Sequence, residues 1–267
     1  MVFGTHNAPG LVNMLLVFGG TTEGKRCATA LSGAGEAFIY STKTPVVMNP
    51  LPGMSPRTGP LTPEALMEFC RSESIRGIVH ASHPFAEQLH STISSTAEVL
   101  DLPVWRFERC YPARENAGAH IRYVPDFVAA IEALQAMNRA PLLALTGVQT
   151  IEKLRPWWQT HPTFFQILDR PASWALAESL DFPRERLLAR DPWYEPDALA
   201  AEIFILGIRM MVTKESGASG FQLVKMEAAR RADVPLLVIQ RPVLPACFQP
   251  VHDEAELLKR IAAARLL

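Results

Sequence analysis

Residues 14–24 read Met-Leu-Leu-Val-Phe-Gly-Gly-Thr-Thr-Glu-Gly, and this stretch decides the fold. Its first five residues are apolar, which is typical of a strand buried on both faces. The two glycines that follow predict a tight turn, and residues 23–32 then predict a helix. A buried strand that passes through a glycine turn into a helix is the first unit of a parallel α/β sheet.

Short apolar runs and amphipathic segments alternate along the rest of the chain. They predict strands at residues 37–40, 77–79, 104–107, 142–145, 164–168, 187–189, 210–213 and 236–239. They predict helices at residues 63–73, 84–100, 127–138, 151–158, 172–180, 196–206, 221–232 and 253–264, and irregular loops at 44–60 and between 107 and 126.

Because such alternation builds parallel sheets through right-handed crossovers, we expect an α/β protein. Its expected architecture is two Rossmann-like, doubly wound parallel-sheet domains with an interdomain cleft. We expect a disordered lead at residues 1–13, one domain at 14–139 that binds the cofactor, and a second at 140–267 that completes the substrate site.

The composition argues against several classes of function. Lys plus Arg number 26 and Asp plus Glu 27, so nucleic acid would meet no basic excess and is not an expected partner. No apolar run approaches ~18 residues and no basic leader opens the chain, so we expect a cytoplasmic protein with no membrane partner. The four cysteines are scattered and the histidines lack metal-ligand spacing, which indicates neither a disulfide scaffold nor a metal site. The expected state is a monomer or a homodimer.

Ligands of doubly wound sheets bind where the strands end, and four turns have that position: residues 19–24, 80–84, 146–149 and 213–220. In the first, Gly19 and Gly20 let the backbone approach a phosphate, whose charge the free N–H groups of the helix start would stabilise. The spacing is not G-x-G-x-x-G, so a tight turn that binds nothing is the alternative. Its place at the first strand–helix turn favours a dinucleotide site.

The second strand ends in Tyr40-Ser41-Thr42-Lys43. Sites that prefer NADH usually place an acidic side chain here to bind the ribose hydroxyls. Two hydroxyls and a cation suit the additional phosphate of NADPH instead. We therefore expect NADPH, with an ordinary polar loop as the alternative.

The turn at 213–220, Thr-Lys-Glu-Ser-Gly-Ala-Ser-Gly, is rich in hydroxyls and glycine and precedes the helix that carries Lys225. Such a turn presents backbone N–H donors and Lys214 to an anion. In the turn at 80–84, His83 precedes a proline, which favours an extended backbone at the strand tip. His83 can donate to a substrate carboxylate or relay a proton, or it can serve only to cap the next helix.

Three segments resemble the precorrin-6A reductases of cobalamin biosynthesis, in the cobalt-free and the cobalt-containing branches. They are the glycine turn at 19–24, the Ser82-His83-Pro84-Phe85-Ala86 turn, and the Thr213-Lys214-Glu215-Ser216-Gly217 turn with its continuation through Gly220, Lys225, Ala228-Ala229 and Ile239-Gln240-Arg241-Pro242. The resemblance covers about residues 14–242, and its third segment is highly specific.

The resemblance implies two Rossmann-like domains that bind NADPH and a tetrapyrrole, and reduction of one double bond of precorrin-6A or cobalt-precorrin-6A to give precorrin-6B or its cobalt form. The implied cofactor-binding residues are Gly19, Gly20, Thr21, Thr22, Glu23, Ser41, Thr42 and Lys43. The implied substrate-binding residues, which face the carboxylates of the tetrapyrrole, are Ser82, Lys214, Glu215, Ser216, Gly217, Ser219, Gly220, Lys225 and Arg241. The expected catalytic residues are His83, as proton donor, and Lys214.

Four loops depart from the family pattern, at His80 in place of an aspartate, Gly59-Pro60-Leu61 in place of Gly-Arg-Leu, Val148 in place of a basic residue, and Arg190-Asp191-Pro192-Trp193 in place of Gln-Gly-Pro-Phe. These departures bear on the choice of substrate more than on the fold. They are also compatible with the alternative hypothesis of a divergent family member that acts on, or merely binds, a related tetrapyrrole. A glycosyl- or nucleotide-transferring enzyme with two Rossmann halves, which would bind a sugar nucleotide, is a third hypothesis.

Overall fold

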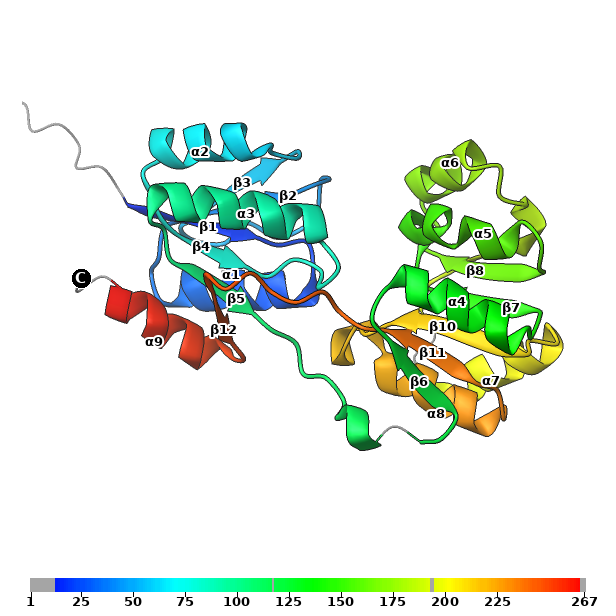
Figure 1. The fold of residues 1–267 in the computed structure, drawn as a ribbon. Helices are drawn as coiled ribbons and strands as arrows, with labels where there is room; N and C mark the ends of the chain where they lie inside the picture. The colour runs from blue at the N-terminus through cyan, green and yellow to red at the C-terminus, as the bar shows by residue number, and fades with distance from the viewer. Residues whose placement is uncertain (1–12, 117, 193–194, 265–267) are drawn as a thin grey trace, which may run out of the picture. The chain divides into compact units, whose positions relative to one another are not determined.

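The computed structural model describes residues 13–116, 118–192 and 195–264, and the chain forms two α/β units (Figure 1). Unit 1 combines the chain up to Arg109 with the segment from Pro242 onward, and unit 2 spans Cys110–Arg241. The expectation of two doubly wound parallel-sheet domains is confirmed. The expected lead at 1–13 lies, except for Asn13, outside the described residues.

Unit 1 contains a six-stranded parallel sheet in the order β3-β2-β1-β4-β5-β12. Its strands are β1 (Met14–Phe18), β2 (Phe38–Thr42), β3 (Met54–Thr58), β4 (Ile75–His80), β5 (Val104–Phe107) and β12 (Phe248–Val251). Its helices are α1 (Thr22–Gly33), α2 (Pro63–Ser72), α3 (Glu87–Leu100) and α9 (Glu254–Ala264). This strand order is that of a dinucleotide-binding Rossmann sheet.

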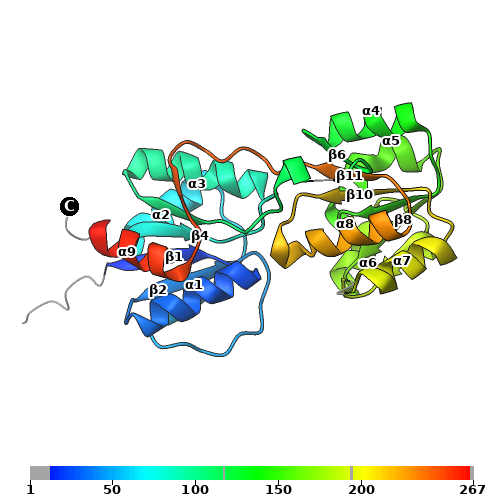
Figure 2. The same ribbon diagram turned by 90° about the horizontal axis from the view of Figure 1, so that it is seen from below.

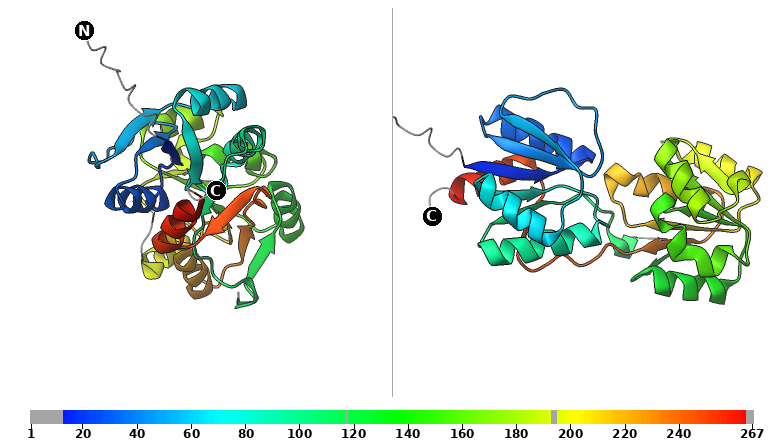
Figure 3. Two further views of the ribbon diagram at one scale, coloured as in Figure 1. Left: turned by 90° about the vertical axis from the view of Figure 1, so that its left-hand side faces the viewer. Right: turned by 90° about the horizontal axis from the view of Figure 1, so that it is seen from above.

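Helices cover both faces of the unit 1 sheet (Figures 2 and 3). One core cluster joins the sheet to α1 and α9, through residues such as Leu31 and Leu257, and a second joins it to α2 and α3, through residues such as Leu66 and Ile93. Because both faces are covered, successive residues of β1 are fully buried on opposite sides. This explains why that strand reads as an unbroken apolar run.

Unit 2 contains a second six-stranded parallel sheet in the order β6-β11-β10-β7-β8-β9. Its strands are β6 (Ile121–Val124), β7 (Leu142–Leu145), β8 (Thr163–Ile167), β9 (Leu187–Ala189), β10 (Met210–Lys214) and β11 (Leu236–Ile239). Its α-helices are α4 (Phe127–Met137), α5 (Arg155–Trp158), α6 (Pro171–Ser179), α7 (Pro196–Ile205) and α8 (Gln222–Arg231), and 3₁₀ turns include η1 (Arg114–Asn116), η2 (Val148–Thr150), η3 (Glu152–Leu154), η4 (Arg184–Arg186) and η5 (Ala218–Gly220).

The sixth strand of each sheet corrects the expected domain boundary. Strand β6 lies before residue 140 yet pairs with β11 of unit 2, and β12 follows unit 2 yet pairs with β5 of unit 1. The unit therefore changes after Arg109 and again after Arg241, not once near residue 140. Both strands are four-residue edge strands with polar or proline positions, so neither produces an apolar run that sequence patterning detects.

Two further expectations need correction. The expected loop at 44–60 contains β3, an edge strand of sequence Met-Ser-Pro-Arg-Thr whose polar residues hide it. The expected helix at 151–158 is broken into η3 and the short α5. Pro156 lies in the first turn of α5 and has no N–H to continue a helix from the preceding turn.

The return of the chain to unit 1 can be tested at Ile261, which is 1% exposed on α9 against the core shared with α1. Ile261→Ala is expected to lower the free energy of unfolding by about 3 kcal/mol, because it leaves a cavity in that core. Urea denaturation measures the change. Lys259→Ala, on the exposed side of the same helix, is the control and should shift stability by less than about 0.5 kcal/mol. Equal effects from both variants would contradict the packing of α9.

Candidate functional site

Each sheet has one place where the strand order reverses. In unit 1 the chain leaves β1 toward β2 on one side, and β4 lies on its other side; in unit 2, β7 has the same relation to β8 and β10. Doubly wound sheets bind ligands at this switch point, outside the carboxyl ends of the strands. The four turns that the sequence analysis identified stand at the carboxyl ends of β1, β4, β7 and β10.

The glycine turn of unit 1 is built for close backbone packing. A Cβ at Gly19 would lie 2.2 Å from Cζ of Tyr40, and a Cβ at Gly24 would lie 2.7 Å from Cα of Gly19. The Tyr40 hydroxyl accepts a hydrogen bond from the backbone N–H of Gly20 at 3.0 Å, and Gly20 has a φ of +87°. The turn therefore needs glycine at both packed positions and leaves its outer side open to a ligand.

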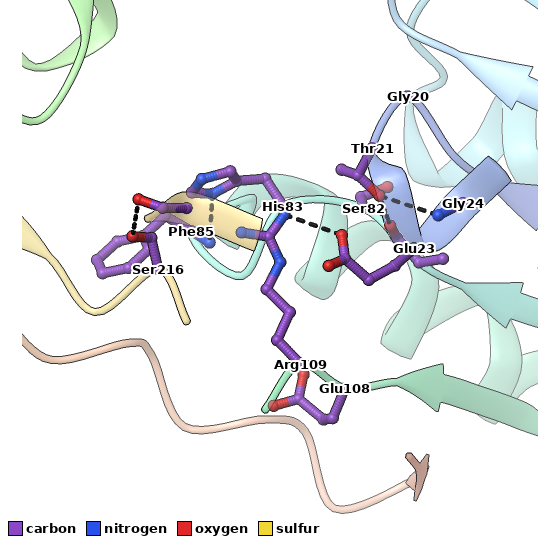
Figure 4. A network of polar contacts seen from close by, with 12 residues as sticks. Gly20, Thr21, Glu23, Gly24, Ser82, His83, Phe85, Glu108, Arg109 and Ser216 are labelled. Carbon is purple, nitrogen blue, oxygen red and sulfur yellow. Dashed lines mark hydrogen bonds and ion pairs between the residues drawn. The ribbon is translucent and has the colours of Figure 1, made fainter. Parts of the chain in front are cut away.

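Thr21 joins this turn to the neighbouring one (Figure 4). Its Oγ1 accepts from the N–H of Gly24 at 3.0 Å, which caps α1, and donates to the carbonyl of Ala81 at 2.6 Å. The hydroxyl thus ties the turn after β1 to the turn after β4. The N–H groups of the first helical turn have no partners within the helix, so they present positive potential at this edge.

Glu23 lies in that first turn, and its carboxylate is buried in an ion pair. Arg109 Nη2 is 3.1 Å from Glu23 Oε2, and the two side chains are 6% and 4% exposed (Figure 4). The guanidinium compensates the carboxylate, so the start of α1 keeps its positive character despite the acid. The side chain of Glu23 is therefore better suited to holding the turn than to touching a cofactor.

The end of β2 carries a cation that sequence reasoning missed. Ser41 and Thr42 are buried there and Lys43 is exposed. On the neighbouring β3, Arg57 donates through Nη1 to Ser41 Oγ at 3.2 Å and to the carbonyl of Gly59 at 2.6 Å. Burial lowers the pKa of the Arg57 guanidinium, and no carboxylate pairs with it in the part of the chain that the structure describes. A partly buried guanidinium without an acidic partner is a natural anion site.

The turn after β4 orients His83. The backbone N–H of Phe85 donates to His83 Nδ1 at 3.2 Å, so in the neutral ring the proton lies on Nε2 (Figure 4). Ser82 Oγ donates to the carbonyl of Phe18 at 3.3 Å, and its own carbonyl accepts from the buried Arg106 at 2.9 Å. Hydrogen bonds from Ser82 and Arg106 thus fix the turn in place, and Nε2 is the donor nitrogen of the neutral His83 ring.

Beneath this turn lies a buried pair of histidines. The ring centroids of His80 and His90 are 5.0 Å apart, and Phe248 stacks edge-on against both. Burial, and secondarily the charge of Arg106, lowers the pKa of His90 to about 4 and that of His80 well below 6.5. Both nitrogens of His80 lack a hydrogen-bond partner among the described residues. His80, fully buried, can act on a ligand only through packing.

In unit 2 the turn after β10 is organised by Glu215, whose side chain is 1% exposed. Arg114 binds it through two bonds, Nε to Oε1 at 2.9 Å and Nη2 to Oε2 at 2.8 Å. The backbone N–H of Arg241 donates to Oε2 at 3.0 Å and its guanidinium lies 3.1 Å from the same oxygen. Burial alone would raise the pKa of Glu215, but these donors outweigh it and hold the pKa below its usual range. Glu215 is therefore an ionised organiser of the turn, and Arg114 is a second residue that sequence reasoning missed.

The rest of this turn is fixed by its own hydrogen bonds. Gln222 Oε1 accepts from the N–H of Gly217 at 2.9 Å, and Ser216 Oγ donates to the carbonyl of Gly220 at 3.1 Å. Ser219 is exposed, whereas Lys214 and Lys225 are half-buried. The expected substrate residues of unit 2 thus gather around one turn and the end of β11.

The other turn of unit 2, after β7, has the position of the glycine turn of unit 1 but not its form. It leads into η2 instead of an α-helix. Thr150 Oγ1 donates to the carbonyl of Gly147 at 2.8 Å and lies within hydrogen-bond distance of Thr146 Oγ1, at 2.6 Å. No α-helix begins directly after this turn, so of the two turns only the one in unit 1 has the form of a dinucleotide-binding turn.

Comparison with known proteins gives the family. A family model described as precorrin-6x reductase CbiJ/CobK matches residues 14–262. The chain belongs to the precorrin-6x reductase family. It is 32% identical over 240 residues to the cobalt-precorrin-6A reductase of Synechocystis sp., which covers 85% of this chain and 87% of the relative. It is 30% identical over 239 residues to the precorrin-6A reductase of Rhodobacter capsulatus, covering 87% and 89%.

A solved structure titled CobK precorrin-6A reductase has the same fold, with a TM-score of 0.74 and 22% identity over 94% of this chain and 97% of the other. Of the departures in this precorrin-6x reductase family member, Pro60 and Asp191 lie in described loops and Val148 begins η2, whereas Trp193 lies outside the described residues. In the described part of the chain, no helix is long and apolar enough to cross a membrane, and no group of three His, Cys, Asp or Glu residues is placed to hold a metal ion.

The buried histidines predict a pH-dependent stability. Because the folded protein keeps His90 neutral down to a pKa of about 4, the unfolded chain binds more protons between pH 6.5 and 4. Stability should therefore fall as pH drops through this window, by on the order of 2 kcal/mol from His90. Denaturant unfolding between pH 7 and pH 4 measures the slope.

His90→Gln is expected to make this slope shallower. His252→Gln, at an exposed histidine of the same unit, should leave it as in the native protein. Identical slopes for all three proteins would show that His90 is not buried in the neutral form.

Proposed function

We propose that this protein is an NADPH-dependent reductase of precorrin-6A or cobalt-precorrin-6A. Membership of the precorrin-6x reductase family supports the reaction class. The observation that carries the cofactor choice is the pairing of a glycine turn at the start of α1 with a cation, Arg57, at the end of the neighbouring strands.

The glycine turn fits the diphosphate of a dinucleotide. Gly20 leaves room for phosphate oxygens, since a Cβ there would meet only Thr42 Cγ2 at 3.9 Å, whereas Gly19 makes room for the Tyr40 ring; the N–H groups of Thr22 and Glu23 lie in the first helical turn. Arg109 neutralises Glu23, which removes the one charge there that would repel a phosphate. When bound, the nicotinamide supplies the hydride.

The ribose end of the site favours NADPH over NADH. No carboxylate follows β2, which ends in Ser41 and Thr42 with Lys43 next along the chain. Arg57 and Lys43 would bind the 2′-phosphate, while Ser41 holds the Arg57 guanidinium in place. An NADH site would call for an acid that hydrogen-bonds the ribose hydroxyls.

The turn after β10 suits a substrate that carries several carboxylates. Lys214, Lys225 and Arg241 supply positive charge, and Ser219 adds a hydroxyl, whereas the backbone N–H of Gly220 already donates to the carbonyl of Gly217 at 3.1 Å. The organising role of Glu215 differs from the direct contact that the family resemblance implies for it. Acetate and propionate groups of the macrocycle would bind at these cations.

Reduction of the double bond adds a hydride to one carbon and a proton to the other, while NADPH is oxidised to NADP⁺. We assign His83 as the proton donor in its imidazolium form, which gives up the Nε2 proton and is left neutral; protonation of the ring requires the contact of Nδ1 with the N–H of Phe85 to open. Solvent water is the alternative donor, because a large macrocycle leaves parts of its edge in water. Lys214 stabilises charge on the reacting ring.

The nucleotide preference is tested by fluorescence titration with NADPH and with NADH. The native protein should bind NADPH more tightly. Arg57→Gln should weaken NADPH binding by ~10- to 100-fold and leave NADH binding nearly unchanged, because a charge-assisted bond to phosphate is worth about 1.5–3 kcal/mol. Arg71→Gln, at an exposed arginine on α2, is the matched control. Failure of the native protein to bind either nucleotide would overturn the proposed function.

The reaction is tested by anaerobic oxidation of NADPH in the presence of precorrin-6A, with and without cobalt. His83→Gln should lower kcat by ~10²-fold or more and change KM little if His83 delivers the proton. Normal turnover by this variant would assign the proton to solvent. Tetrapyrrole binding without any oxidation of NADPH by the native protein would instead identify a binding protein.

A further inference from the structure

The least exposed carboxylate at the edge of the unit 2 sheet serves two guanidiniums at once. Glu215 follows β10, and its two oxygens accept from Arg114 and from Arg241 at 2.8 to 3.1 Å. Two guanidiniums thus converge on one buried carboxylate.

Arg114 is held rigidly by its contacts, but these contacts do not use all of its hydrogen-bond donors. Glu215 occupies Nε and Nη2, and the Tyr123 ring lies 5.5 Å from the guanidinium carbon. Nη1 has no hydrogen-bond partner among the residues that the structure describes. The side chain is 44% exposed although its partner is 1% exposed. A fixed, solvent-facing guanidinium with donors to spare is suited to binding an anion.

Arg241 is fixed on the other side of the same carboxylate. Its guanidinium carbon lies 3.7 Å above the Tyr111 ring, and its side chain is 32% exposed. Tyr111 and Arg114 both belong to the segment that leads into β6. In this segment the carbonyl of Cys110 accepts a hydrogen bond from the N–H of Ala218. This segment is therefore joined to the turn after β10 and belongs to the same edge of the sheet.

We propose that Arg114 binds a peripheral carboxylate of the substrate, next to Arg241, and that Glu215 is the positioning residue that orients both guanidiniums. This inference rests on the proposed function for the identity of the ligand as a polycarboxylate macrocycle. It adds a binding residue from a segment outside all three motifs. The planar guanidinium donates two parallel bonds to a carboxylate, a geometry that lysine cannot reproduce.

Steady-state kinetics with precorrin-6A tests the role of Arg114. Arg114→Gln should raise KM by ~10- to 100-fold with kcat within about twofold, because only substrate binding loses a charge-assisted contact. Arg114→Lys should recover part of that loss. Arg231→Gln, at an exposed ion pair of the same unit, should leave KM unchanged. NADPH binding should be equal in all four proteins, which shows that the variants are folded.

A second measurement needs no turnover. Uroporphyrin, which bears acetate and propionate groups on its pyrrole rings, is titrated against the protein by fluorescence. Arg114→Gln should weaken this binding by ~10-fold or more, and the difference should shrink at high salt. An unchanged Kd for uroporphyrin together with an unchanged KM would overturn the assignment of Arg114. If the native protein does not bind NADPH, the proposed function itself is contradicted. Failure of the Arg114 assignment and failure of the proposed function are therefore distinguishable.

The positioning role of Glu215 is tested by a double-mutant cycle. Glu215→Gln should raise KM because Arg114 keeps its charge but loses its fixed orientation. The double variant with Arg114→Gln should then be little worse than Arg114→Gln alone. Strictly additive effects on KM would contradict action of Glu215 through Arg114.

Discussion

All strands in both sheets run parallel to their neighbours, and this constraint determines where the chemistry of the molecule can lie. A parallel strand must be followed by a crossover to the opposite edge of the sheet, so the turns that leave the strands gather at one edge. The glycine turn, the His83 turn and the end of β2 share that edge in unit 1. In unit 2, the Glu215 turn and the end of β11 lie together at the corresponding edge of the second sheet. Residues far apart in the sequence become neighbours because the sheet leaves them no other place.

Two buried carboxylates then organise these edges. Glu23 pairs with Arg109 beneath the start of α1, and Glu215 binds two arginines beside the turn after β10. In each case the acid is almost fully buried and an arginine compensates it. Breaking such a pair leaves an uncompensated charge in a poorly solvated place, which is strongly unfavourable. The acids are thereby held in alignment, and the positive groups that a phosphate or a carboxylate would meet are held in fixed positions.

The sequence predicted the central parts of the fold better than its margins. Leu15, Leu16 and Val17 are buried on both faces of a sheet, so the run that contains them is unmistakable. Strands β6 and β12 lie at sheet edges, contact one neighbour each and carry polar residues, so nothing in their pattern separates them from loops. The domain boundary was misplaced for the same reason, since it depends on which sheet these two strands join.

The candidate site was predictable to a similar extent. Turns at strand ends follow from strand positions, and the glycine turn and the Thr213–Gly220 segment were found in that way. Arg57 and Arg114 were not found, because each is placed at the sheet edge by contact with a residue that is distant in the sequence. Arg57 faces Ser41 across a strand pairing that the sequence does not reveal, and Arg114 finds Glu215 about a hundred residues away. A register error or a missed edge strand is enough to hide such residues.

The two units also show how little of the function the topology fixes. The turn after β1 and the turn after β7 have the same place in the same strand order. After β1, Thr21 caps a twelve-residue α-helix whose first N–H groups point to the edge. After β7, Thr150 turns back onto Thr146 and Gly147, and the chain forms a short 3₁₀ turn. One hydroxyl caps a helix and the other closes a loop, so two equivalent positions differ in whether an α-helix presents its first N–H groups there. Around Glu215 the positive charge comes from side-chain cations, whereas at the turn after β1 it comes from the backbone itself.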